Sequence, residues 1–360
     1  MFGHERSRRT ANCIAEKRTF ADFAKLTTRA PVSTRSMLRR SFLSAVVAGF
    51  ITAKSSVSIA SQAASPNVID VMPTFWKFWD STIQQPNDVR VQAFFNTVVA
   101  AYPDLFHHGL IASGALTDLG SVPEVQERVS KYLHDVKPYI PTMRDITINI
   151  HKNFSRYVND FSRTFADYAP TTPVYFTVSL FGFAAGMNLS GETPGLYFGI
   201  DELARIHGSN DNLKVIFDHE LFHQYHHQIA PEISANEVAW AYMWEEGLAT
   251  YVSRQMSPGC TIDQALMIPS RLSELAKPHL RELAQRLLDE PDSTDPTTYL
   301  DLFSTDKTPA GLPARSGYYL GFRVAEMLGA TRSLTELAHL RGPELKHAVL
   351  EALTELRNRS

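Results

Sequence analysis

The stretch Leu213–Ile229, LKVIFDHELFHQYHHQI, contains the most informative pattern in the chain, His219-Glu220-Leu221-Phe222-His223. The apolar run that leads into it, together with Phe222 and Tyr225, predicts a buried helix. Residues four apart lie on the same face of a helix, so His219 and His223 can present two imidazoles to one metal ion.

Glu220 follows the first histidine and is tilted toward the same side of the helix without being a ligand. In that position it can accept a proton from a water molecule held at a zinc ion. The chemistry implied is attack of that water on a carbonyl, most often that of a peptide bond. An H-E-x-x-H pattern arises by chance in roughly two per cent of chains of this length, so two histidines with ordinary hydrogen bonds are the alternative.

A second segment, Trp244–Tyr251 with the sequence WEEGLATY, is predicted to lie on a helix one short crossover downstream. Catalytic zinc needs three protein ligands and an open position, and a carboxylate is a usual third ligand. Glu246 is the natural donor, because Gly247 beside it removes a side chain where two helices and a metal must approach closely. Glu245 is the competitor, but the two side chains point about 100° apart on a helix, so only one can face the metal.

Together, HELFH and WEEGLATY resemble the paired motifs of the gluzincin superfamily, in which H-E-x-x-H lies on one helix and E-G-hydrophobic-A on the next. Within that superfamily, the chain is most similar to the bacterial predicted zinc-dependent proteases of an uncharacterised domain family. The resemblance implies zinc held by His219, His223 and Glu246, with Glu220 as general base.

The resemblance is specific over about residues 213–253 and rests on the order of elements alone over about 140–330. Two departures stand out. The gap between the second histidine and Glu246 is a few residues longer than in aminopeptidase-type members, and it contains Pro231. Thr250 stands where thermolysin-like members place an aspartate, so the usual second carboxylate near the metal is expected from elsewhere.

The histidines that follow the motif are rival ligands. The metzincin pattern needs a third histidine six residues after the second, and that position holds Ile229. His226 and His227 lie three and four residues after His223, where they could support the metal site or line the cleft. Because histidine has many ordinary polar roles, we expect both to be partly exposed residues at the end of the helix.

Two segments upstream of the metal helix are predicted to be strands, Val174–Phe181 and Pro194–Asp201. In the gluzincin arrangement, an edge strand beside the metal helix pairs with an extended peptide. By that resemblance, the Gly195–Asp201 segment is the candidate edge strand. An ordinary sheet strand without substrate contact is the alternative.

The segment Arg315–Phe322 is the last candidate for the site. A tetrahedral intermediate needs a donor for its developing oxyanion besides zinc. Tyr318 is the predicted donor and Tyr319 the alternative. A plain packing role for both tyrosines also remains open, because buried tyrosines usually find a partner for the hydroxyl.

The composition argues against nucleic acid as the substrate. The 360-residue chain has a formal net charge of −3, and its body carries no basic stripe. It contains no G-x-S-x-G elbow and no phosphate-cradling glycine loop, so a serine hydrolase or nucleotide enzyme lacks support. The expected partner is a peptide or protein, as the H-E-x-x-H pattern and the gluzincin resemblance imply.

The first part of the chain has the order of an export signal. Residues 1–40 are basic, an apolar run extends from Phe42 to Ala53, and a Ser/Ala-rich stretch reaches Ser65. The run is shorter than the about 20 apolar residues of a membrane-spanning helix, so we expect no stable span after signal cleavage. The protein is predicted to be exported, periplasmic or secreted, with an organellar transit peptide as the alternative.

Details within this region refine the export prediction. Arg39-Arg40-Ser41-Phe42-Leu43 resembles the twin-arginine motif, which implies translocation of a folded protein. Cleavage is expected after Ser61-Gln62-Ala63 or after Ser58-Ile59-Ala60. Met37 directly precedes the signal and is an alternative start. Only one cysteine, Cys260, follows the signal, so no disulfide is expected within the mature chain.

The predicted organisation has three parts. Residues 1–64 form the export signal, 65–140 a helical N-terminal region, and 141–360 a gluzincin-like zinc peptidase domain with a helical C-terminal part. Apolar spacing over 143–168 predicts one long amphipathic helix that backs the sheet. The expected fold class is α+β, mainly helical: a zincin-like domain with a small mixed sheet, an active-site helix pair and a helical N-terminal region.

The leading functional hypothesis is an exported zinc metallopeptidase. Glu220 takes the proton of the attacking water and passes it to the leaving amine, while Tyr318 holds the oxyanion. One alternative is a non-catalytic zinc-binding or peptide-binding module on the same fold. The other is a zinc hydrolase that acts on a non-peptide amide or ester.

Overall fold

A computed structural model describes the protein over residues 65–107, 119–187, 193–208, 213–234, 238–295, 299–305 and 311–359. Residues 62–360 belong to one compact unit. The predicted export signal at 1–64 and both candidate start positions lie outside the described residues. Among the described helices, none is both long enough and apolar enough to cross a bilayer.

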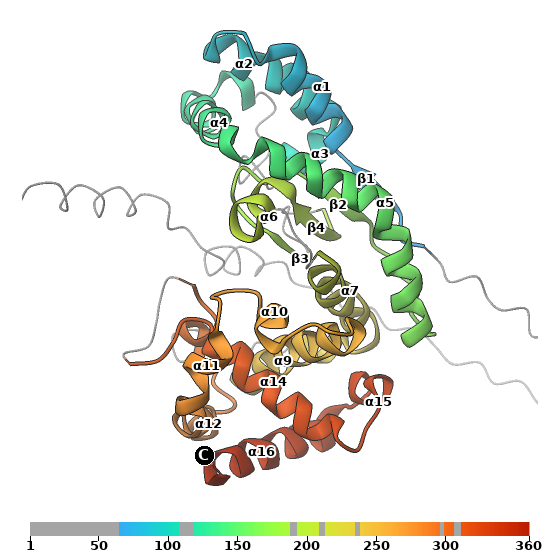
Figure 1. Ribbon diagram of the computed structural model, residues 1–360, viewed down its shortest axis with the longest axis vertical. Helices are drawn as coiled ribbons and strands as arrows, with labels where there is room; N and C mark the ends of the chain where they lie inside the picture. Colours follow the sequence, from blue (N-terminus) through green and yellow to red (C-terminus); the bar gives the residue numbers. More distant parts are fainter. Residues whose placement is uncertain are drawn as a thin grey trace, which may run out of the picture. The chain divides into compact units, whose positions relative to one another are not determined.

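The described part of the chain is mainly helical and contains one small mixed sheet, which confirms the predicted α+β class (Figure 1). The first helices are α1 (Met72–Thr82), α2 (Asn87–Phe94), α3 (Pro103–Leu105) and α4 (Pro123–Asp135). Their aromatic side chains are core residues, as their helical spacing predicts: Phe75, Phe78, Trp79 and Phe94 are all buried.

Helix α5 (Ile140–Thr164) is the predicted long amphipathic helix, and it ends four residues earlier than expected. Its apolar face packs on the sheet and on the helix α7 (Leu213–Ile229), which carries the H-E-x-x-H pattern. The ring of Phe154 lies 5.1 Å from that of Phe176 in the sheet and 5.4 Å from that of Phe217. The three aromatic rings therefore join these elements in one core.

The sheet has the strand order β1-β2-β4-β3, with β1 (Val68–Asp70), β2 (Val174–Thr177), β3 (Ala185–Met187) and β4 (Leu196–Gly199). The strands β1, β2 and β4 are parallel, and β3 runs antiparallel to β4. The prediction that Gly195–Asp201 is the edge strand is therefore wrong. This segment contributes β4, which is paired on both sides, and β3 lies at the edge.

The turn after β2 explains this difference. Leu180 and Phe181 have positive φ values of 55° and 59°, which reverse the chain toward β3. The buried carboxylate of Asp201 accepts hydrogen bonds from the backbone N–H groups of Ser179, at 2.7 Å, and Phe181, at 2.9 Å. Asp201 belongs to α6 (Ile200–His207), so a helix begins where the sequence suggested that strand continues.

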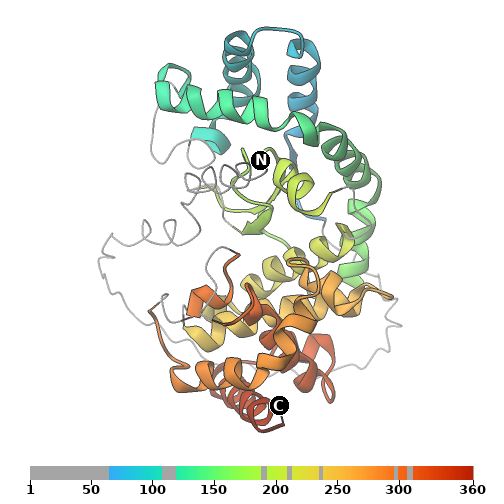
Figure 2. The same cartoon turned by 60° about the vertical axis from the view of Figure 1, so that its left-hand side comes forward.

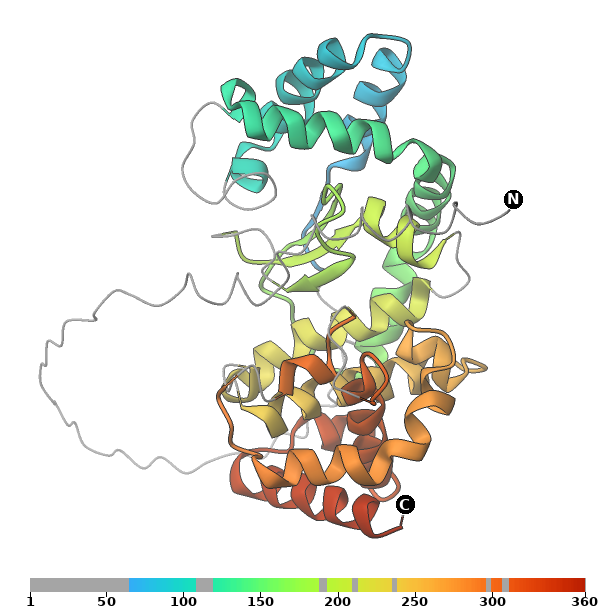
Figure 3. The ribbon, with the colours of Figure 1, turned by 90° about the vertical axis from the view of Figure 1, so that its left-hand side faces the viewer.

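Helix α7 (Leu213–Ile229) lies against β3, β4 and α5, and it also contacts α9 (Ala239–Met256). Figures 2 and 3 show the same order from two further directions: the yellow-green sheet, then α7, then α9 and the orange and red helices. Helix α9 packs in turn on α14 (Ser316–Gly329). The metal motif thus lies on a helix that is enclosed by a sheet and two other helices.

The remaining α-helices of the described chain follow α7, in agreement with the helical C-terminal part that the sequence predicts. They are α8 (Pro231–Ser234), α10 (Ile262–Leu266), α11 (Leu272–Ala276), α12 (Leu280–Asp289), α15 (Leu334–Ala338) and α16 (Gly342–Arg359). Helix α16 packs on α12, α14 and α9 and completes the C-terminal group.

Candidate metal centre

The helices α7 and α9 bring three potential metal ligands together: His219, His223 and Glu246. The Nε2 atoms of the two histidines are 3.1 Å apart. Each of them is 3.5 Å from Oε2 of Glu246. The three atoms therefore form a nearly equilateral triangle.

This triangle fits a tetrahedral zinc ion. Ligands bound about 2.0–2.1 Å from zinc with tetrahedral angles are about 3.3 Å apart, which is close to all three separations. Two imidazole nitrogens and one carboxylate oxygen are also the donor set of many catalytic zinc sites. The residues that would hold a metal are thus pre-arranged by helix packing.

Glu245 does not join the triangle. Its Oε1 lies 3.8 Å from Nδ1 of His223 and 3.0 Å from Nε2 of His227. It is therefore placed behind His223, where a carboxylate orients a ligating imidazole and increases its basicity. Glu245, the residue before Glu246, is thus the candidate for the second carboxylate that the sequence left unassigned.

Thr250 has a different role from the aspartate of thermolysin-like proteins. Its hydroxyl donates a hydrogen bond of 2.8 Å to the backbone carbonyl of Glu246, one turn earlier on α9. Nδ1 of His219 is buried and has no hydrogen-bond partner among the described residues. The two histidines of the triangle therefore differ: among the described residues, Nδ1 of His223 has a carboxylate 3.8 Å away, and Nδ1 of His219 has no hydrogen-bond partner.

The structure separates the two following histidines. His226 is fully buried and stacks on Phe222, with ring centroids 5.3 Å apart. Burial lowers the pKa of His226 to about 3, so its ring is neutral at physiological pH. The expectation of partial exposure is wrong for His226, because α7 has sheet and helices on several sides. It holds for His227, whose side chain is 33% exposed.

Glu220 lies beside the triangle with a perturbed carboxyl group. Burial raises the pKa of Glu220, and the negative charge of Glu246 raises it further. The two histidines of the triangle and Arg315 lower it by a smaller amount, so the pKa stays above that of an ordinary glutamate. A carboxylate with a raised pKa is better matched to proton transfer near neutral pH than an ordinary glutamate. Its position and its electrostatics therefore agree with the general-base role expected from the sequence.

The structure brings Tyr318 to the cluster and directs Tyr319 elsewhere. Burial raises the pKa of Tyr318, and the negative charges of Glu246 and Glu220 contribute in the same direction, so the hydroxyl is close to both carboxylates. The hydroxyl of Tyr319 instead accepts a 3.4 Å hydrogen bond from Nη1 of Arg323. Of the two, Tyr318 is therefore the tyrosine that lies beside the carboxylates of the cluster.

A glycine crossing accounts for this placement of Tyr318. A Cβ atom on Gly247 would overlap the backbone of Gly321, and one on Gly321 would overlap the carbonyl oxygen of Met243. The helices α9 and α14 therefore touch backbone to backbone at this point. Tyr318 lies three residues before Gly321 and Glu246 directly before Gly247, so the crossing sets their proximity. The backbone of α14 occupies the space beside Gly247. The sequence predicted a close approach at this glycine but did not identify α14 as the helix involved.

The chain matches no known family model, no curated protein and no solved structure.

Two residues near the cluster received no role in the sequence analysis: Tyr242, which it did not name, and Arg315, which it named only as the start of the candidate segment Arg315–Phe322. Burial raises the pKa of Tyr242 well above 10, with further contributions from Glu246 and Tyr318. Its position four residues before Glu246 on α9 is the signal that could have identified it. Arg315 stacks on Tyr318, with the guanidinium carbon 3.9 Å from the ring centroid. No sequence pattern pointed to that contact.

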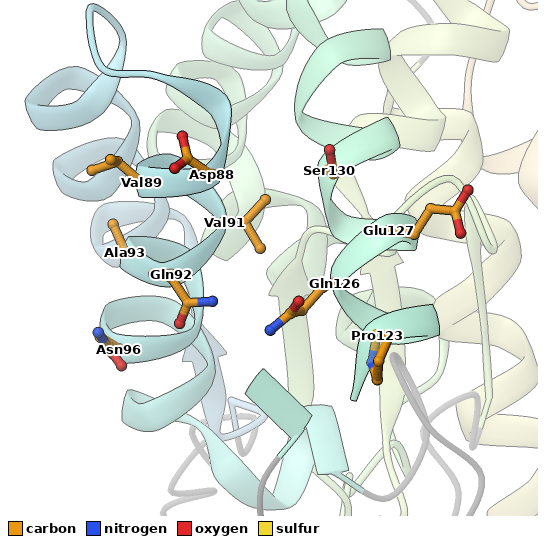
Figure 4. A pocket seen from close by; sticks show the side chains of 10 residues that line it. All are labelled: Asp88, Val89, Val91, Gln92, Ala93, Asn96, Pro123, Gln126, Glu127 and Ser130. Atoms are coloured by element: carbon orange, nitrogen blue, oxygen red, sulfur yellow. The ribbon is translucent and has the colours of Figure 1, made fainter. Parts of the chain in front are cut away.

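A surface hollow between α2 and α4 offers no comparable chemistry. Figure 4 shows the side chains that line it, which include Asp88, Gln126 and Glu127. Its lining contains no histidine and none of the residues of the metal cluster. The candidate site therefore remains the cluster on α7, α9 and α14.

Proposed function

We propose that the protein is a zinc-dependent peptidase in a zincin-like fold, with His219, His223 and Glu246 as the metal ligands. The observation that carries the proposal is the triangle of donor atoms, together with Glu220 and Tyr318 at its side. Zinc at this site would polarise the scissile carbonyl and lower the pKa of the attacking water.

Glu220 and Tyr318 supply the proton transfer and the hydrogen bond that the reaction also needs. Glu220 accepts the proton of the attacking water and delivers it to the leaving amine. The hydroxyl of Tyr318 donates to the oxygen of the scissile carbonyl as negative charge develops there. Its raised pKa keeps the proton on the phenol at physiological pH, as a hydrogen-bond donor requires.

Substrate would bind along β3. This strand contacts α7, and the described part of the chain places no strand on its outer side. An extended peptide can therefore pair with the backbone of Ala185–Met187 and pass over the metal helix. The predicted export signal adds the proposal that this reaction takes place outside the cytoplasm.

Metal content tests the proposal directly. We expect about one zinc per chain, measured by mass spectrometry on the purified protein, and strongly reduced zinc in Glu246→Gln. The matched control is Glu245→Gln, which keeps zinc at stoichiometric loading because it removes only the support behind His223. Zinc retained in Glu246→Gln and lost in Glu245→Gln would reassign the third ligand. No zinc in any form after reconstitution would overturn the proposal.

A further inference from the structure

Arg315 occupies an unusual position at the entrance to α14. It directly precedes the helix, with a φ of 59° in the left-handed region, and its backbone N–H donates a 3.2 Å hydrogen bond to the carbonyl oxygen of Ser304. A non-glycine residue in this conformation is uncommon and stays there only when its surroundings fix it. The backbone therefore holds the arginine beside Tyr318.

The guanidinium has no counter-ion among the described residues. No carboxylate of the described chain lies within 4.0 Å of it, and its buried Nε has no hydrogen-bond partner. By contrast, Arg286 pairs with Asp301 at 2.8 Å and Arg323 with Glu326 at 2.8 Å. A guanidinium without a counter-ion, whose Nε–H has no acceptor among the described residues, keeps a donor available for an anion that enters the site.

The charge of Arg315 reaches the reaction residues. Burial lowers the pKa of His207 to about 4, and Arg315 contributes in the same direction, so His207 adds no second positive charge. The charge also opposes the rise in the pKa of Glu220 and of Tyr318. The guanidinium carbon lies 3.9 Å from the ring centroid of Tyr318, so Arg315 is a cation beside the proposed oxyanion donor.

We propose that Arg315 binds a carboxylate of the substrate close to the scissile bond. This inference rests on the proposed peptidase function and specifies its substrate class. The planar guanidinium can form two parallel hydrogen bonds with a carboxylate, and the ring of Tyr318 supports its free face. The carboxylate comes either from the C-terminus of a peptide, which means C-terminal trimming, or from an aspartate or glutamate side chain, which means internal cleavage beside acidic residues.

The test measures binding without hydrolysis. Protein with Glu220→Gln is dialysed to equilibrium against hexapeptides of shared sequence in three forms: free C-terminal acid, C-terminal amide, and amide with one internal glutamate. Mass spectrometry measures the excess of each peptide in the protein compartment over the buffer compartment, which is the amount bound. We expect the carboxylate-bearing form to bind about 10- to 100-fold more tightly than the plain amide.

The control variants decide whether Arg315 is responsible. Adding Arg315→Met should abolish the difference between acid and amide, whereas Arg315→Lys should retain part of it. Arg323→Met removes a paired arginine from the same helix and should leave the difference unchanged. Thermal unfolding of each variant shows whether the fold persists, and the lysine variant preserves the test if the methionine variant unfolds.

Each outcome has a definite meaning. A preference for the free acid assigns the terminal carboxylate, and a preference for the glutamate amide assigns the side chain. Equal retention of all forms, a difference that survives Arg315→Met, or no retention at all overturns the inference. Zinc content and peptide cleavage by the unsubstituted protein are measured in parallel. Arg315-dependent retention without zinc or cleavage would refute the peptidase and leave a carboxylate-binding site.

Discussion

The helices α5 and α7 pack against each other but bury different chemistry. Helix α5 buries mainly apolar side chains. Its three buried hydroxyl-bearing residues all bond within the helix: Thr147 to the carbonyl of Met143 at 2.8 Å, Ser162 to that of Val158 at 2.9 Å, and Tyr157 to Oδ1 of Asn149 at 3.3 Å. Helix α5 therefore needs little from the rest of the chain besides a complementary apolar surface.

Helix α7 buries groups that its own backbone cannot satisfy. Asp218 accepts hydrogen bonds from Lys214 at 2.5 Å and from Ser257 at 3.2 Å, at the far end of α9. Gln224 donates to the carbonyl of Thr172 at 3.1 Å and accepts from the hydroxyl of Tyr168 at 2.6 Å. Buried polar groups that need distant partners fix a helix in one position, and the candidate general base, Glu220, lies on that helix.

The largest expected effect is a loss of activity without a loss of stability. Glu220→Gln on α7 should lower kcat for peptide hydrolysis by about 10²- to 10⁴-fold, because it removes the group that transfers the proton. Zinc content and the unfolding temperature should remain near those of the parent. Asp145→Asn removes an exposed carboxylate from α5 and is the matched control, with no change in kcat. If Glu220→Gln kept the parent's activity, Glu220 could not be the general base.

The second prediction is a substitution that should lower stability and leave activity unchanged. Ile150 is buried on α5, and Ile150→Ala should lower the free energy of unfolding by about 2–4 kcal/mol through lost burial and a cavity. Urea denaturation measures that loss. Because α5 supplies no group to the site, activity per folded molecule should stay within about twofold. A large fall in the activity of the folded fraction would show that α5 positions α7 more finely than apolar packing alone.

The third prediction concerns pH and Asp218. Burial raises the pKa of this carboxyl from 3.8 to about 6, although Lys214 and Ser257 oppose the rise. A raised pKa in the folded state means that the contribution to stability is complete below about pH 4 and is lost as the pH rises through 6. Asp218 should therefore add about 1 kcal/mol to the free energy of unfolding when the pH falls from 7 to 5.

Comparison of the parent with Asp218→Asn isolates this contribution, because the other titrating groups are common to both proteins. Chemical denaturation at pH 5 and pH 7, in the same metal state, gives the two differences. The gain should be present in the parent and absent in the variant. An identical pH response in both would mean that Lys214 holds the carboxylate ionised throughout.

The smallest effect is expected on α5. Thr147→Val removes a hydroxyl whose acceptor is a carbonyl of the preceding turn, in a volume that valine fills. The free energy of unfolding should change by less than about 1 kcal/mol, with no change in activity.

The matching substitution on α7 is Gln224→Leu, which leaves Tyr168 and Thr172 without their hydrogen-bond partner. It should lower the free energy of unfolding by more, about 1–3 kcal/mol. Equal costs would contradict the contrast between the two helices.

The features that depend on local spacing could be predicted from the amino-acid sequence alone. The four-residue step between His219 and His223 places both on one face of any helix, and the apolar periodicity of 143–168 specifies a helix with a single buried side. The mainly helical class with a small sheet followed from the same patterns and is confirmed. These properties arise within one or two helical turns and need no knowledge of distant contacts.

Tertiary structure decided the features that depend on pairing between distant segments. The edge strand is β3, whose Ala-Gly-Met sequence carries little strand propensity and is held by pairing with β4. The placement of Tyr318 rather than Tyr319 beside Glu246 follows from the crossing of Gly247 and Gly321, which are 74 positions apart in the chain. Arg315 reaches the cluster by the same crossing. The physical reason is that close packing between segments fixes side-chain direction, and no local pattern encodes which segments will meet.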